Sequence, residues 1–171
     1  MTIVAVPIAL PISAPQIYNR YGVGDPVSLQ ILEEIRKTMA AIPDVVWADF
    51  WESSLFVSGF ATPCITIRQT GNPHTGDESC HTSLDELLIE IDFIMELVHE
   101  SRQAARWREA LSQYLLLIEQ AVRANRSWGG LARGTQIESR SIYDPVEDLV
   151  SCALSIRVSY GTAANDLTIP A

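Results

Sequence analysis

The chain has 171 residues, of which 47% are hydrophobic and 19% charged, and its formal net charge is −9. The length suits one domain with a full core, the composition argues against global disorder, and the charge argues against binding nucleic acid through phosphate neutralisation. The three cysteines, Cys64, Cys80 and Cys152, cannot all pair, which favours a reducing compartment over a disulfide framework. Because no apolar run approaches the roughly 20 residues that a membrane-spanning helix needs, we expect no membrane partner.

Residues 1–24 are predicted to form an extended N-terminal arm. Pro7, Pro11 and Pro15 interrupt the apolar sequence and disfavour a helix, and the absence of a basic n-region argues against a signal peptide. An apolar arm needs a surface to cover it, either on its own domain or on a neighbouring subunit. The second alternative makes four apolar side chains candidates for a subunit interface: Ile3, Val6, Ile8 and Leu10.

Asp25-Pro26 is a typical helix start, with Asp as the cap and Pro in the first turn. The helix is expected to end at Pro43. Its buried face is predicted from apolar residues that recur at three- and four-residue spacing: Leu29, Leu32, Ile35, Met39 and Ile42.

Two strands are expected next, at Val45–Trp51 and Pro63–Arg68, with a loop or a hairpin tip over Glu52–Thr62. In the second strand, Ile65 and Ile67 are predicted to lie on one face and Thr66 and Arg68 on the other. Trp47 and Trp51 fit either core packing, which is the commoner fate of tryptophan, or an exposed aromatic anchor for a partner.

Gly71–Ser79 is polar and rich in turn residues, so it is predicted to be an exposed loop. Leu88–Leu97 alternates between apolar and acidic residues, which is typical of a half-buried antiparallel strand. Its apolar side is expected to comprise Ile89, Ile91, Phe93, Met95 and Leu97, and its polar side Glu90, Asp92 and Glu96.

The second half of the chain is predicted to begin with a helix over Ser101–Ala124, followed by a turn at Gly129-Gly130. A strand over Ala132–Ser141, a turn at Asp144-Pro145 and an alternating strand over Val150–Tyr160 complete the expected elements. The tail, residues 163–171, is expected to fray unless a partner holds it. The core stripe of the helix is predicted to comprise Trp107, Leu111, Leu115, Ile118 and Val122.

The order of elements predicts an α+β fold: a mostly antiparallel sheet of about five strands with two helices packed on one face, in a single domain over residues 25–162. Phe93, Leu115, Ile118, Leu154 and Ile156 are expected to lie buried between the sheet and the second helix. The helix-free face is predicted to carry charged residues that are candidates for a subunit interface: Arg68, Glu90, Asp92 and Arg157.

Candidate catalytic and metal-binding residues are few. The segment from His74 to His81 collects two imidazoles, two carboxylates and the Cys80 thiol, but its spacing matches no standard zinc pattern. Adjacent residues on a strand point to opposite faces, which argues against a direct contact between Cys80 and its neighbour His81. We therefore predict no catalytic residue, no metal site and no cofactor, and keep a small cytosolic enzyme or ligand-binding domain built on this segment as the alternative.

Three segments resemble the tail terminator proteins of long-tailed bacteriophages. They are the helix end and turn over residues 118–131 (IEQAVRANRSWGGL), the closing strand over residues 154–162 (LSIRVSYGT), and the strand over residues 62–68 (TPCITIR). The resemblance covers roughly residues 25–162, and it leaves the N-terminal arm without a counterpart.

The resemblance implies a structural virion protein, not an enzyme. Such a protein forms a ring, expected to be hexameric, that caps the tail tube and ends its polymerisation. It joins the tail to the head-completion protein at the neck, and DNA passes through its bore. Another neck or tail-completion ring subunit is the alternative within the same class. The acidic composition is compatible with a bore that repels the DNA backbone.

Overall fold

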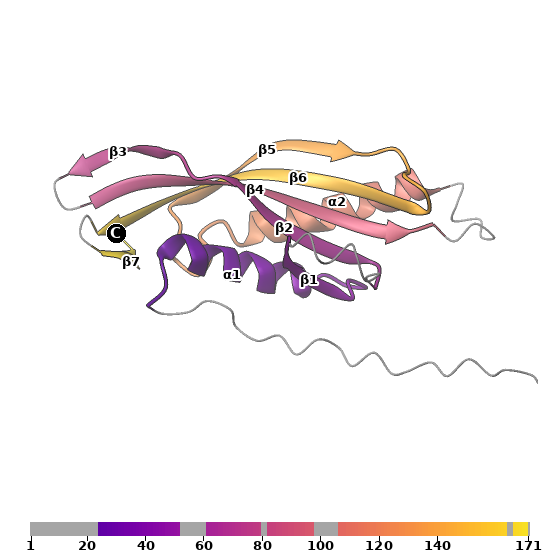
Figure 1. Ribbon diagram of the computed structural model, residues 1–171, viewed down its shortest axis with the longest axis horizontal. Coiled ribbons are helices and arrows are strands. Elements are labelled where there is room, and N and C mark those ends of the chain that lie inside the picture. The colour runs from indigo at the N-terminus through magenta and orange to yellow at the C-terminus, as the bar shows by residue number, and fades with distance from the viewer. Residues whose placement is uncertain (1–23, 52–60, 80–81, 98–105, 164–165, 171) are drawn as a thin grey trace, which may run out of the picture.

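The structure, a computed structural model, describes residues 24–51, 61–79, 82–97, 106–163 and 166–170, without the side chains of residues 74–79 and 82. The described chain forms one mixed sheet with two helices, α1 and α2, on the same face (Figure 1). This arrangement confirms the predicted α+β fold. The N-terminal arm, including the candidate interface residues Ile3, Val6, Ile8 and Leu10, lies outside the described residues.

The sheet has the strand order β1-β2-β4-β6-β5, and two further strands lie off this path, with β3 beside β4 and β7 beside β6. All of these pairs are antiparallel except β1 with β2, which is parallel. Parallel neighbours cannot be joined by a simple two-strand hairpin. Most of the segment predicted as a loop or hairpin tip, residues 52–60, lies outside the described residues. The strand bounds are β1 Trp47–Phe50, β2 Cys64–Gly71, β3 His74–Ser79, β4 Thr82–Glu96, β5 Gly134–Ile142, β6 Leu149–Ala163 and β7 Asp166–Pro170.

Helix α1 spans Val27–Ala40 and begins where the sequence predicts, but not with the predicted cap. Pro26 occupies the cap position, where its carbonyl accepts hydrogen bonds from the amides of Leu29 and Gln30, and no side chain caps the helix. The Asp25 backbone carbonyl instead accepts a hydrogen bond of 2.6 Å from the side chain of Gln30. The buried face extends the predicted one to Val27 and Ile31, while Leu29 is only half-buried.

Helix α2 spans Trp107–Ala124 and buries the predicted stripe of Leu111, Leu115, Ile118 and Val122, with Trp107 half-buried. After it the chain turns through three consecutive left-handed residues, Trp128 at φ 45°, Gly129 at 71° and Gly130 at 88°. Glycine adopts this backbone without a steric penalty, which explains the Gly-Gly pair. The Trp128 side chain is buried, and its Nε1 donates a hydrogen bond of 2.8 Å to Thr135 Oγ1 on β5.

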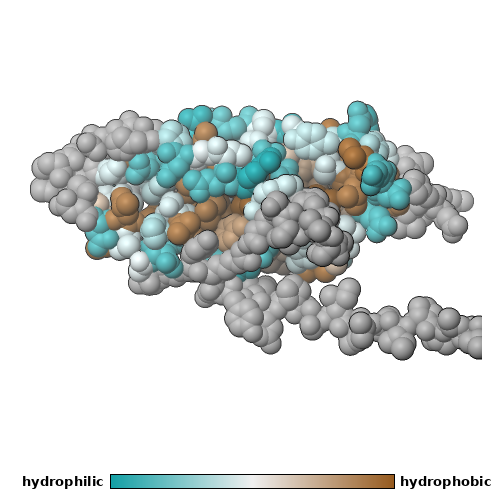
Figure 2. All heavy atoms as spheres, in the orientation of Figure 1, coloured by the Kyte–Doolittle hydropathy of each residue, from teal (hydrophilic) through white to brown (hydrophobic). Residues whose placement is uncertain are grey.

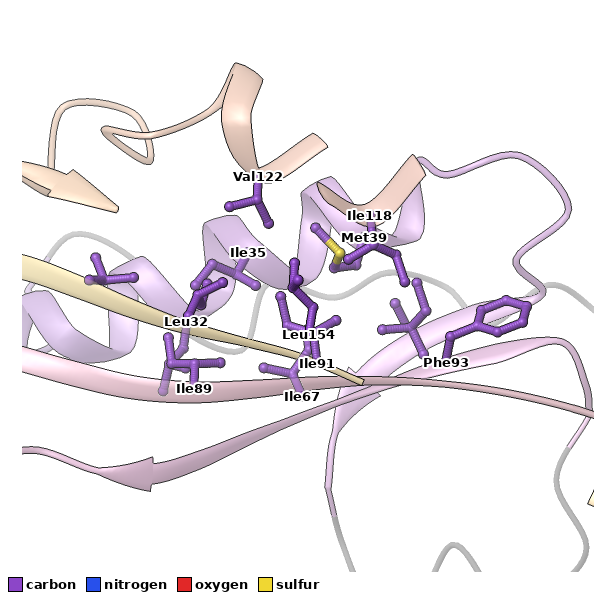
Figure 3. Close-up of a cluster of buried hydrophobic side chains, with 14 of the residues drawn as sticks. Leu32, Ile35, Met39, Ile67, Ile89, Ile91, Phe93, Ile118, Val122 and Leu154 are labelled. Carbon is purple, nitrogen blue, oxygen red and sulfur yellow. The ribbon is translucent and has the colours of Figure 1, made fainter. Parts of the chain in front are cut away.

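The hydrophobic core lies between the helices and the sheet (Figure 3). Side chains from α1 and α2 converge on isoleucines and Phe93 from β2, β4 and β6, and the Phe93 ring stacks on Tyr114 with centroids 4.1 Å apart. All five residues predicted to be buried here are at most 8% exposed. Each such side chain contributes roughly 1.5–3 kcal/mol on burial, so this layer is the main source of stability.

Two segments differ from the sequence prediction. His74–Ser79, within the predicted exposed loop, is strand β3, which pairs with the first half of β4. Asp166–Pro170, within the predicted frayed tail, is strand β7, which pairs with the end of β6. Both are polar or irregular in sequence and become strands because β4 and β6, each 15 residues long, extend beyond the predicted limits and offer them edges.

Candidate subunit interface

The four predicted charged residues of the sheet all lie on its helix-free face. Arg68 and Glu90 are register partners across β2 and β4, and their side chains form an ion pair of 3.1 Å. Asp92 follows two residues later on the same face of β4. Arg157 lies farther along the sheet on β6, so the structure divides the predicted group in two.

Asp92 has the most perturbed environment of this face. Burial, and next the charge of Glu90, raise the pKa of the Asp92 carboxyl from 3.8 to about 6, against the opposing effect of Arg68. Its register partner Thr66 is 1% exposed, and the Thr66 Oγ1 finds no hydrogen-bond partner among the described residues. The Trp51 ring lies 5.5 Å from the Arg68 guanidinium. This part of the face therefore holds a carboxyl group that becomes protonated at a higher pH than an ordinary aspartate.

Arg157 bridges two carboxylates that the prediction did not assign to it. Its Nη1 lies 3.0 Å from Glu86 Oε2 on β4, and its Nε lies 2.9 Å from Glu138 Oε1 on β5. The alternation of β4 places Glu86 on the same face as Glu90, so this partner was accessible from sequence. The sequence could not identify Glu138 as a partner of Arg157, because Glu138 lies at a register shift between Ile137 and Ser139.

The tryptophans divide between the two predicted roles. Trp47 is half-buried and its Nε1 donates a hydrogen bond of 2.8 Å to the carbonyl of Ala61. Trp51 is 39% exposed, so core packing is wrong for this residue. Its exposed ring beside Arg68 adds an aromatic group to the helix-free face.

The enzyme alternative rests on residues that the structure does not describe in full. The side chains of His74–Ser79 and all of residues 80 and 81 lie outside the described part, so that hypothesis stays a prediction. Across the described residues, no group of three or more His, Cys, Asp or Glu is placed to hold a metal ion. Burial raises the pKa of the Cys64 and Cys152 thiols to about 12, which keeps both protonated at neutral pH.

Of the nine exposed large hydrophobic side chains among the described residues, five lie at two ends of the molecule, and Leu116 and Leu117 lie on α2. Ile142 and Val146, with Tyr143 between them, lie around the turn that joins β5 to β6, and Val146 is 72% exposed. Leu167 and Ile169 lie on β7, at the opposite end of the long axis (Figure 1). The intervening surface in the same view is mixed, with hydrophilic residues along its upper edge (Figure 2). Neighbouring apolar groups exposed in this way are candidates for contact with other chains.

The turn between β5 and β6 has an acidic tip, residues 144–148 (Asp144, Pro145, Val146, Glu147 and Asp148). Val146 and Leu149 exchange two backbone hydrogen bonds of 3.0 Å, which leaves Glu147 and Asp148 at the centre of a tight turn. Glu147 adopts a left-handed backbone with φ 55°. The amide of Leu97 donates to the Asp148 carbonyl at 2.6 Å, and Arg108 on α2 forms an ion pair of 2.7 Å with Asp144. These contacts hold the tip against the body of the domain.

A groove of about 300 Å³ lies between the end of α2 and the start of β5. We call it the basic groove, and it is lined by Val122, Arg123, Arg126, Thr135, Gln136 and Ile137. Val122 is buried, so the half-buried Ile137 supplies the accessible apolar floor, whereas both arginines are exposed. No local sequence pattern marks this groove, because its two walls come together only through the turn around Trp128.

One wall of the basic groove is fixed by an ion-pair network. Glu119 on α2 accepts from Arg140 on β5 at 2.6 Å and from Arg123 at 2.7 Å. Hydrogen bonds from Arg140 and then from Arg123 lower the pKa of the Glu119 carboxyl from 4.5 to about 2. The network ties α2 to β5 and engages Arg123. Arg126 makes no ion pair within the described residues.

Comparison with known proteins adds no relative. No protein-family model matches the chain, and no curated protein matches it. Within the described residues, no helix is both long and apolar enough to cross a membrane.

Proposed function

We propose that this protein is a structural subunit of a bacteriophage virion. It forms a ring, expected to be hexameric, that caps the tail tube, ends tube polymerisation and joins the tail to the head-completion proteins at the neck. It has no catalytic role, and it is assembled in the host cytoplasm. DNA passes through the bore without specific binding.

The observation that carries this proposal is the pair of unlike apolar patches at opposite ends of the subunit, around Val146 at one end and around Leu167 and Ile169 at the other. A closed ring needs heterologous contacts, in which one surface meets a different surface of the next copy. A ring between a tail tube and a neck needs further contacts along its axis. A subunit with unlike patches at its two ends has the surfaces that such an assembly requires.

The fold also supports the proposal. The segments that carry the resemblance are α2, the turn around Trp128, and strands β2 and β6. All of them belong to the packed unit that the sheet and its two helices form. Charged groups on the helix-free face are arranged as ion pairs across strands, which suits a surface that is solvated or in contact with another subunit. We propose that the N-terminal arm reaches a neighbouring chain, as its apolar sequence predicts.

Polymerisation of the tail tube protein tests the proposal. Tubes grown with the purified protein should stop at a finite length and carry one ring at one end, seen by electron microscopy. Tubes grown without it should continue to lengthen. Equal tube lengths in both reactions, with no density added at the tube ends, would contradict the proposed function. Another neck or tail-completion subunit would instead bind the finished neck without changing tube length.

A further inference from the structure

The acidic tip and the basic groove are complementary in charge. The tip presents one exposed apolar side chain, Val146, directly followed by the carboxylate of Glu147. The basic groove presents an apolar floor, supplied by the half-buried Ile137, beside the guanidinium of Arg126. An apolar side chain next to a carboxylate on one surface therefore matches an apolar floor next to an arginine on the other.

The two surfaces cannot meet within one molecule. The basic groove lies at the start of β5, at Thr135–Ile137, and the acidic tip follows its last residue, Ile142. At about 3.3 Å per strand residue, the two surfaces are roughly 20 Å or more apart. Strand β5 pairs with β6 on both sides of the register shift at Glu138, so the strand cannot fold back to bring the two surfaces together. Any contact between them joins two copies of the chain.

We propose that the acidic tip of one copy docks into the basic groove of the next copy, with Val146 against the apolar floor and the Glu147 carboxylate on Arg126. This inference rests on the proposed function, because it assigns the side-to-side contact of the ring. The contact is heterologous, since the tip and the groove are different surfaces, and repetition of one such contact closes a ring if the rotation permits.

Three features of the tip and the groove suit them to this contact. The Val146–Leu149 turn, with its two backbone hydrogen bonds, presents the tip in one conformation and limits the entropy lost on docking. Arg123 is already engaged by Glu119, which leaves Arg126 as the groove's guanidinium for a carboxylate from outside. A charge-assisted bond between arginine and carboxylate fixes register and suppresses wrong partners.

Charge reversal tests the proposal in the full-length protein, with assembly size measured by sedimentation or mass photometry. Glu147→Arg alone and Arg126→Glu alone should each raise the dissociation constant between copies by about tenfold or more, because like charges then face each other. Glu34→Arg makes the same change of charge on α1, at a half-exposed position whose carboxylate pairs with Lys37 at 2.9 Å, and it should assemble like the wild type. Thermal melts of each variant check that the fold is kept.

The decisive experiment mixes the Glu147→Arg and Arg126→Glu variants in equal amounts. The reversed tip of one variant then faces the reversed groove of the other, and the two native surfaces also face each other, so alternating copies should recover wild-type assembly. Assembly by either single variant at the wild-type dissociation constant, or no recovery in the mixture, would overturn the inference and leave the proposed function standing. A wild-type protein that forms no ring, alone or on tail tubes, would overturn both.

Discussion

The two faces of strand β4 differ sharply, although the same 15 residues form both. On one face Ile89, Ile91 and Phe93 are at most 1% exposed beneath the helices, whereas on the other Glu90 and Asp92 are half-buried among charged neighbours. The first face is fixed by packing, which is insensitive to pH. The second is held by ion pairs that depend on protonation. The core therefore lies on one side of the sheet, whereas the helix-free side combines ion pairs with a buried patch that includes Thr66, Ile94 and Ala153.

The largest expected effect lies on the packed face. Leu115→Ala should lower the free energy of unfolding by about 2–5 kcal/mol, because it leaves a cavity beneath α2. The adjacent Leu116 is 54% exposed, so Leu116→Ala is a matched control with an expected loss below about 0.5 kcal/mol. Urea unfolding of both variants measures the difference. Equal losses would show that the helix does not bury the face that the structure assigns to it.

At neutral pH, Asp92→Asn should stabilise the fold, whereas Leu115→Ala destabilises it. The Asp92→Asn effect should be the smaller of the two. The native pKa of Asp92 is about 6, above its ordinary 3.8, so the folded state holds a proton that the unfolded state has released between these values. Stability is therefore lost as pH rises through this window, and the uncharged amide should raise it by about 1–2 kcal/mol at pH near 8, after a discount for partial exposure.

The gain from Asp92→Asn should vanish below a pH of about 4, where the carboxyl is protonated in both states. Urea unfolding at the two pH values measures it. Glu96→Gln, an exposed position on the same strand, is the control and should change little at either pH. A variant that is less stable than the wild type near pH 8 would show that the Asp92 carboxylate is stabilising instead.

The smallest expected effect concerns the Glu119 network between α2 and β5. Its lowered pKa means that the network stabilises the fold above the ordinary value of 4.5 and loses this contribution as pH falls towards 2. Glu119→Gln should cost about 1 kcal/mol at neutral pH, because the two arginine partners are about half exposed and water screens the interaction. Denaturant melts of variant and wild type should converge in acid. A constant difference across this range would assign the loss to packing.

Sequence periodicity predicts the elements whose pattern comes from burial. Helices α1 and α2 and the central parts of β2, β4 and β6 carry a regular apolar pattern because each has one face in the core. Strand β3 carries no such pattern, and in β7 the alternation covers only Leu167 and Ile169, whose side chains are exposed. Both strands form by pairing with the ends of longer strands, so propensity alone marks them as loop or tail.

In the candidate interface, too, the sequence predicts what periodicity determines and misses what pairing between elements determines. Alternation places Arg68, Glu90, Asp92 and Arg157 on one face, which the structure confirms. Their pairing depends on register, which brings Arg68 to Glu90 but sends Arg157 to Glu86 and Glu138. The basic groove lies between a helix end and a strand start that only the left-handed turn at Trp128 brings together. No local pattern in the sequence encodes such a surface.

Electron microscopy of the purified protein, alone and bound to tail tubes, would show whether this chain is the subunit of a closed ring. We expect end-on class averages with six-fold cyclic symmetry around an open bore wide enough for duplex DNA. Averages that show only monomers or two-fold dimers in both preparations would contradict it.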